Sequence, residues 1–199
     1  DLLVLDQEEN LPWMKSEAPC RVHVFHATSI QVMPRELRGL AKFFEDEVRK
    51  KLEAQAEAWN GLLQDAPLLW MWDQVPGELR RAGPNRNRFD QVIYVIWKKP
   101  WMRVTRETFI GSVLENLGAA DIQVSSSEKY PHFDPADFDP ERTLLLLSSE
   151  PYPFGLKWDE QPELEKFTRV LVGGESFSWF GVRSFRFLSE HRARSSHHG

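Results

Sequence analysis

The chain has 199 residues, of which 41% are hydrophobic and 28% charged, a composition that is ordinary for a globular protein. Its net charge of −5 argues against broad binding to nucleic acid or to anionic membranes. No apolar run approaches the roughly 20 residues that a membrane-spanning helix needs. The single cysteine, Cys20, excludes an intramolecular disulfide. The length fits one domain or two small ones.

Residues 1–33 contain two short apolar runs, Leu2–Leu5 and Val22–Phe25, each followed by a polar loop. Both runs are typical of strands, but two strands are too few to bury a core of their own. The first residue already belongs to a predicted strand and no initiator Met is present. We therefore expect residues 1–33 to be the remainder of an N-terminal α/β lobe, whose earlier part and targeting signal are missing from this sequence.

A single long helix is predicted over residues 34–63. Pro34 suits the first helical position, and three acidic residues each precede a basic residue by four positions. At about 1.5 Å per residue such a helix reaches roughly 45 Å, which would suit a rigid strut between two lobes. Its apolar stripe at helical spacing comprises Leu37, Leu40, Ala41, Phe44, Val48, Leu52, Ala56, Trp59 and Leu63.

Residues 64–91 are interpreted as an elaborated connection, residues 92–190 as a C-terminal α/β lobe, and residues 191–199 as a disordered tail. In the C-terminal lobe, apolar runs alternate with helical patterns, which indicates a parallel sheet covered on both faces. The expected helices are residues 106–117, with Thr105 as N-cap and Gly118 at the end, and residues 162–167. The expected strands are Val92–Trp97, Asp121–Val124, Leu144–Leu147 and Val170–Val172.

The loops that follow these four strands share an unusual composition of aromatic residues, proline or glycine, and small hydroxyls. Strand ends of a parallel sheet meet at one edge, where ligands bind, so the loops predict a stacking surface for a large flat ligand. Alternatively, these aromatics only plug the end of the sheet. We expect Trp101 to project toward the ligand and Trp97 to lie in the sheet core. Lys98 and Lys99 would face either the ligand rim or solvent.

Four stretches resemble the helical-backbone metal-receptor superfamily, and more narrowly the cobalamin-type substrate-binding proteins of ABC importers: "DLLVLDQEEN", "IWKKPWMRVTRETFI", "LLLLSSEPYPF" and "GGESFSWFGVR". The resemblance implies two Rossmann-like α/β lobes joined by a long backbone helix, with the first lobe incomplete here and the ligand held between the lobes. It also implies a periplasmic or membrane-anchored extracytoplasmic location. Gly173, Ser176 and Phe180 depart from the family pattern, which leaves the polar contacts of the last loop open.

The resemblance further implies a ligand, a partner and their contacts. The ligand would be a cobalamin-like corrinoid or another metal chelate, and the partner an ABC permease that docks at Glu8 and Glu9. We expect a monomer without a covalently bound cofactor, a protein metal site or a nucleic-acid partner. The predicted ligand contacts are Trp101, Met102, Tyr130, Tyr152, Phe154, Phe177 and Trp179.

Other function classes remain open beside this interpretation. Haem or a ferric siderophore would suit the same architecture, and the chain could instead be a non-transport α/β interaction module. An enzyme is the rival class, but the sequence has no glycine-rich phosphate loop, no CxxC motif and no serine elbow. His23 and His26 would lie on opposite faces of a strand, and Ser148 and Ser149 have no His or Asp partner at a telling spacing. We read Glu150 as a carboxylate that orients its loop rather than as an acid or base, so no catalytic residue is expected.

Overall fold

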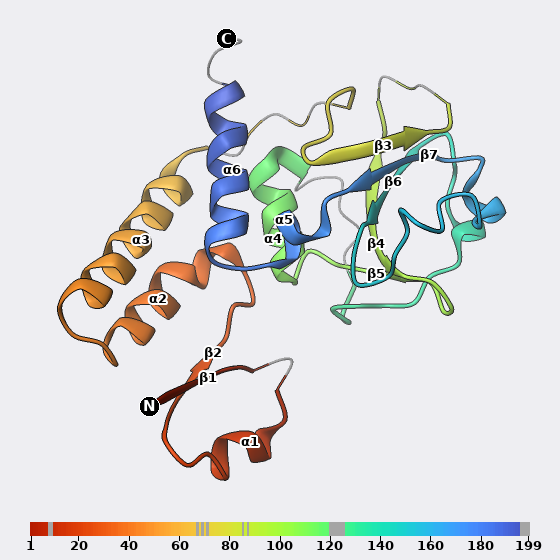
Figure 1. Cartoon of the computed structure of the whole chain (residues 1–199). Helices are drawn as coiled ribbons and strands as arrows, with labels where there is room; N and C mark the ends of the chain where they lie inside the picture. The colour runs from red at the N-terminus through yellow and green to blue at the C-terminus, as the bar shows by residue number, and fades with distance from the viewer. Residues whose placement is uncertain are drawn as a thin grey trace. The chain divides into compact units, whose positions relative to one another are not determined.

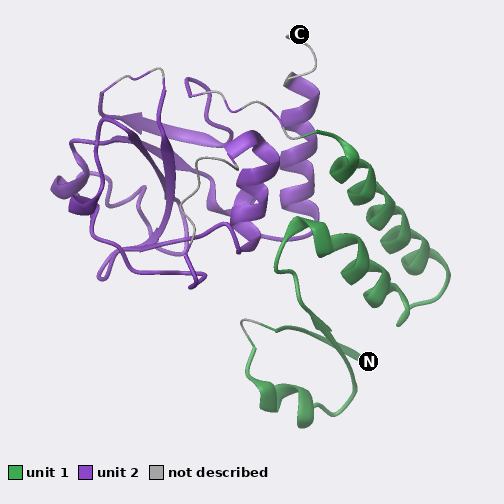
Figure 2. Cartoon of the chain, turned by 180° about the vertical axis from the view of Figure 1, so that it is seen from behind, with its two compact units in different colours: residues 1–66 green, residues 67–199 purple. Residues whose placement is uncertain are grey.

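The computed structural model describes residues 1–7, 10–66, 68, 70, 72–84, 86, 88–119 and 126–195. It divides into two compact units, residues 1–66 and residues 67–199 (Figure 2). No helix among the described residues is long and apolar enough to cross a membrane.

The first unit begins with two parallel strands, β1 (Leu2–Asp6) and β2 (Arg21–Phe25), joined through the short helix α1 (Pro12–Ser16). The register runs from Leu2 opposite Arg21 to Asp6 opposite Phe25. Both predicted strands are therefore confirmed, and their richness in Leu and Val explains them, because branched and apolar side chains favour a pleated, half-buried surface. Pro12 opens α1, where its missing N–H costs no hydrogen bond.

The prediction of one unbroken helix over residues 34–63 is wrong. After the 3₁₀ turn η1 (Ile30–Val32), the chain forms two helices, α2 (Met33–Ala41) and α3 (Asp46–Gln64), which pack against each other. Glu45 is extended and Asp46 has a φ of 48°, so the backbone turns between the helices. The apolar spacing continues through this turn, which is why periodicity alone could not separate a helical hairpin from a straight helix.

The second unit is built on a five-stranded sheet with the order β3-β7-β6-β4-β5. Its three central strands are parallel and confirm three of the predicted strands: β4 (Gln91–Trp97), β6 (Thr143–Ser148) and β7 (Thr168–Val172). The two edge strands, β3 (Glu78–Ala82) and β5 (Met102–Arg103), are antiparallel, so the sheet is mixed rather than wholly parallel. β3 comes from the stretch interpreted as a connection. The predicted strand Asp121–Val124 lies outside the described residues.

Helices gather on one side of this sheet (Figure 1): α4 (Phe109–Leu114) with its continuation η2 (Glu115–Ala119), α5 (Gly174–Ser178) and α6 (Val182–Ser195). The N-cap of α4 is Thr108 rather than Thr105, because the Thr108 hydroxyl accepts from the Gly111 N–H at 2.9 Å. Gly118, at a φ of 93°, ends the helical stretch as predicted. α6 continues to Ser195, so the tail expected to be disordered from residue 191 is helical over its first five residues.

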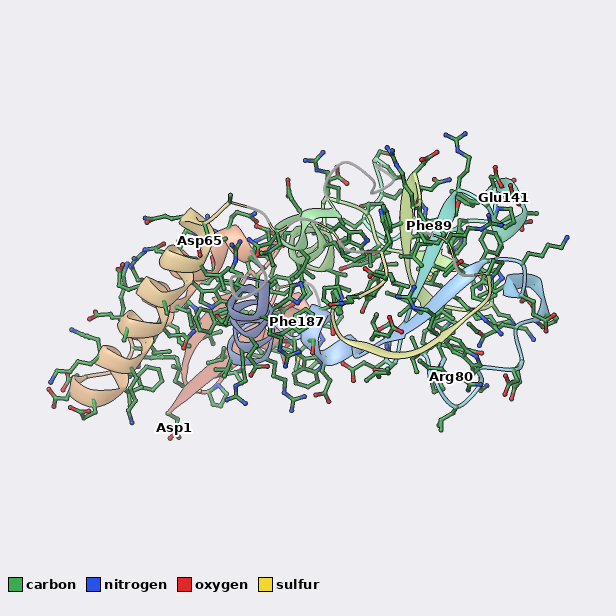
Figure 3. All side chains as sticks on the ribbon, turned by 90° about the horizontal axis from the view of Figure 1, so that it is seen from above. Asp1, Asp65, Arg80, Phe89, Glu141 and Phe187 are labelled. Carbon is green, nitrogen blue, oxygen red and sulfur yellow. The ribbon has the colours of Figure 1, made fainter. Side chains whose placement is uncertain are left out.

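The opposite face of the sheet is covered mainly by an irregular segment, residues 149–167. The helix predicted over residues 162–167 is only the 3₁₀ turn η5 (Pro162–Leu164). A second such turn, η4 (Pro135–Asp137), lies in the loop before β6. Apolar side chains of this segment, including Phe154, fill the core against the strands. Two guanidinium groups lie over the Trp158 ring: that of Arg80, on β3 (Figure 3), at 4.8 Å from the ring centroid, and that of Arg169 at 4.7 Å. Burying each such aromatic side chain stabilises the fold by roughly 1.5–3 kcal/mol.

Candidate functional site

The carboxyl ends of β4, β6 and β7 share one edge of the sheet, because the three strands are parallel. The loops that leave this edge are residues 98–102, 149–154 and 173–181; we call the edge and these loops the aromatic edge. The fourth predicted loop is the one expected after Asp121–Val124. It runs beside β5, where Met102 bridges to His132 and the Arg103 N–H donates to the Pro131 carbonyl at 3.2 Å. Three of the four loops therefore converge as predicted, and the fourth lies along the neighbouring edge strand.

Two of the predicted ligand contacts, Phe154 and Phe177, are fully buried. The ring of Phe154 lies 4.6 Å from that of Tyr152, within the core face covered by residues 149–167. Phe177 packs on the other face, with its centroid 5.3 Å from Tyr94 of β4 and 5.0 Å from Phe187 of α6. Both side chains therefore belong to the core and do not form part of the candidate ligand surface.

Trp101 is half-buried and packed rather than projecting freely. Its ring is stacked on that of Phe154, with 6.1 Å between centroids and 5° between planes. The Lys98 ammonium lies 5.2 Å from the Trp101 ring, pairs with Glu163 at 3.0 Å and donates to the Glu160 carbonyl at 2.7 Å. Lys98 therefore holds the β4–β5 turn against residues 160–163 and is not a solvated lysine.

Trp97, which the sequence placed in the sheet core, is 40% exposed. It is the last residue of β4, and its ring meets that of half-buried Tyr152 edge to face at 5.5 Å. Met102 is half-buried and lies opposite Trp97 in the β4–β5 pairing. Tyr130 is 40% exposed on the fourth loop. The sequence signal that could have identified Trp97 is its position, since a strand's final residue often lies beyond the packed layer.

Trp179 is the most exposed aromatic side chain of the aromatic edge, at 53%. Its indole N–H donates to the Glu150 carboxylate at 2.6 Å. The Arg183 guanidinium lies 5.0 Å from the ring centroid and forms an ion pair with Glu175. Trp179 is thus exposed at this edge, and the Glu150 carboxylate, which the sequence predicted to orient its own loop, is hydrogen-bonded to the loop that follows β7.

Ser148, the last residue of β6, and Ser149, the residue after it, both stabilise the loop that follows. Tyr94 donates its hydroxyl to the Ser148 hydroxyl at 3.1 Å, and Ser148 in turn donates to the Glu150 carbonyl. Burial raises the pKa of Tyr94, so its hydroxyl stays protonated and remains a donor. The Ser149 hydroxyl accepts from the Gly174 N–H at 2.9 Å. With these partners, neither serine is arranged as a nucleophile beside a base.

The sequence also raised His23 and His26 as possible metal ligands, and Glu8 and Glu9 as docking residues. The His23 ring packs against Phe25 and Phe43, and burial lowers its pKa although Glu36 opposes that effect. Within the described ranges, no group of three or more His, Cys, Asp or Glu side chains could hold a metal ion. The proposed docking residues Glu8 and Glu9 lie outside the described residues.

No protein-family model matches the chain, and no curated protein sequence is significantly similar to it. Its structure, however, is similar to solved periplasmic binding proteins over nearly its whole length. The vitamin B12-binding protein BtuF of Vibrio cholerae matches 98% of this chain and 74% of its own, at 14% identity and a TM-score of 0.62. The apo haem-binding protein RhuT of Roseiflexus sp. RS-1 matches the same shares at 13% identity and a TM-score of 0.63.

An ABC-transporter substrate-binding protein of Listeria monocytogenes EGD-e is similar to the same extent, with 96% of this chain and 74% of its own matched at 14% identity and a TM-score of 0.64. The chain therefore has the two-lobe α/β fold of periplasmic binding proteins.

Proposed function

We propose that the chain is the substrate-binding component of an ABC-type importer, which captures a cobalamin-like corrinoid or another metal chelate. The observation that carries the proposal is the display of Trp97, Tyr152 and Trp179 along the aromatic edge. In an α/β fold, ligands bind at this end of the strands, and exposed aromatic rings there favour a large flat ligand. The fold it shares with B12-binding and haem-binding proteins supports the same class of ligand.

Each of these rings would contribute on the order of 1–2 kcal/mol through stacking and burial of apolar surface. Trp101 contributes indirectly, because its stack on Phe154 holds the β4–β5 turn in place. Met102 and Tyr130, both accessible at the neighbouring edge strand, complete the proposed contact surface. The ligand is held and released without chemical change, so the protein is not an enzyme and has no covalently bound cofactor.

The proposed cellular setting follows from this role. The protein works outside the cytoplasm as a monomer and delivers its ligand to a membrane permease. Glu8 and Glu9 are the proposed contacts with basic residues of that permease, where charge pairs mainly set the association rate and its dependence on salt. Reversing both charges should therefore slow docking most strongly at low ionic strength.

Haem is a second candidate ligand, favoured by the structural likeness to RhuT and to Staphylococcus aureus IsdE, whose solved structure contains haem. Titrating the purified chain with cyanocobalamin, haemin and a ferric siderophore, followed by absorbance and calorimetry, tests the proposal. We expect saturable one-to-one binding of one of these chelates, with a spectral shift. Absence of binding of all three, both to this chain and to a longer chain with the first lobe restored, would reject the transport role and favour a non-transport interaction module.

A further inference from the structure

Trp179 is unusual because it is exposed and yet held on two sides. An indole has a single hydrogen-bond donor, its N–H, and here that donor is bound to Glu150 at 2.6 Å. A charged acceptor makes this bond stronger than one between neutral groups. The bond therefore fixes the direction in which the indole ring extends from α5.

Glu150 is itself held in place by the core of the second unit. Its carbonyl accepts from the Ser148 hydroxyl, which is bound in turn to the buried Tyr94 hydroxyl. A Cβ atom on Gly174 would lie 2.5 Å from the Ser148 hydroxyl and 2.7 Å from the Glu150 Cγ, so the glycine permits this close contact. A continuous set of contacts thus connects the interior of β4 to the exposed indole.

One face of the indole is already occupied. Arg183, on α6, lies 5.0 Å from the ring centroid, and its ion pair with Glu175 keeps it there. The nitrogen edge of the ring is bound to Glu150, and 53% of the residue remains exposed, so we infer that a ligand would approach the face opposite Arg183. A ring that is fixed before binding loses little conformational entropy when a ligand stacks on it.

We propose that Glu150 is the positioning residue that fixes Trp179 as a one-faced stacking platform for the planar ring system of the ligand. The proposal rests on the proposed function, because it assumes a flat chelate as the ligand. Glu150 acts through the indole and need not touch the ligand itself. Its contribution should therefore depend on the presence of the indole N–H.

A double-mutant cycle tests this dependence. The dissociation constant is measured for whichever of cyanocobalamin and haemin binds the wild-type chain, in the wild type and in Glu150→Ala, Trp179→Phe and the double variant. We expect Glu150→Ala to weaken binding about five- to tenfold in the wild-type background and less than twofold in the Trp179→Phe background, where no N–H remains. Glu150→Gln should recover most of the affinity, because its amide oxygen still accepts the bond.

A ligand-free measurement gives an independent readout. In chain labelled with 5-fluorotryptophan, the ¹⁹F resonance of Trp179 is assigned by its loss in Trp179→Phe. Glu150→Ala should shift or broaden it, while the exposed control Glu107→Ala should leave it unchanged. An unchanged resonance, or equal affinities of Glu150→Ala and the wild type, would overturn the inference alone. If the wild type bound only a ferric siderophore, the inference would fall and the proposed function would stand; if it bound none of the three chelates, both would fall.

Discussion

Trp101 and Trp179 follow two different strands of the same sheet edge, yet their surroundings differ. Trp101 is half-buried, stacked on Phe154 and covered by Lys98. Trp179 is 53% exposed and is held by one hydrogen bond and one guanidinium. Aromatic residues at the aromatic edge thus divide into those that anchor their loop and those that a ligand can reach. Composition alone does not distinguish the two groups.

The largest change in stability is expected from replacing Trp101, the tryptophan that anchors its loop. Trp101→Ala removes the stack on Phe154 and leaves a cavity beside the core, so the free energy of unfolding should fall by about 3 kcal/mol. Trp101→Phe should restore much of it, because a ring remains to stack. Urea denaturation of the two variants checks this. A loss below about 1 kcal/mol for Trp101→Ala would mean that Trp101 is not an anchor.

A smaller loss is expected where the loops of β6 and β7 meet. A Cβ atom at Gly174 would lie within 2.7 Å of both Ser148 and Glu150, whereas at the adjacent Gly173 its nearest neighbour is the Ser176 hydroxyl at 3.9 Å. Gly174→Ala should therefore lower the free energy of unfolding by roughly 1–3 kcal/mol through overpacking. Gly173→Ala is the matched control and should change it by less than about 0.5 kcal/mol. If the two variants had the same free energy of unfolding, the close contact at Gly174 would not be present.

The smallest effect on stability is expected for the contacts of Lys98 with Glu163 and the Glu160 carbonyl, which we call the Lys98 clamp. This effect should depend on pH. Burial opposes ionisation of Glu163, but its backbone hydrogen bond and Lys98 outweigh burial and lower its pKa from the ordinary value of 4.5. A carboxylate with a lowered pKa adds stability above its unfolded pKa, and that stability is lost as pH falls through the folded pKa. Because Glu163 is partly exposed, the contribution should stay below about 1 kcal/mol.

Replacing Lys98 by Met tests the clamp. The stability difference between the wild type and Lys98→Met should be largest near pH 6 and should shrink as the pH falls below about 4.5. Chemical denaturation at several pH values measures it. A difference that stays constant over this range would indicate that the hydrogen bond to the Glu160 carbonyl, rather than the ion pair with Glu163, holds the turn.

The elements that the sequence predicted well are those whose apolar runs are continuous. β4, β6 and β7 are buried on both faces, and such strands leave a strong signal. β3 was missed because Glu78–Ala82 is mostly charged, as edge strands often are. The break between α2 and α3 was missed because neither Gly nor Pro marks it, and the apolar spacing continues through the turn.

The candidate site was predictable as a set of loops but not residue by residue. Strand ends are fixed by the parallel register, so the convergence of the loops followed from the pattern. Exposure within a loop depends instead on which side chains the neighbouring segments cover. Phe154 was therefore expected at the ligand surface and Trp97 in the core, whereas Phe154 is buried and Trp97 is 40% exposed.

The measurement that tests the account most directly is the affinity of Trp179→Ala, set beside its stability. The central claim is that the displayed aromatic rings bind the ligand. The variant should bind cyanocobalamin or haemin, whichever the wild type binds, about tenfold more weakly, equivalent to about 1.4 kcal/mol. Its free energy of unfolding should fall by no more than about 1 kcal/mol, since the residue is 53% exposed and its hydrogen bond to Glu150 lies at the surface. A variant that binds as tightly as the wild type, or that loses affinity only in proportion to unfolding, would contradict the claim.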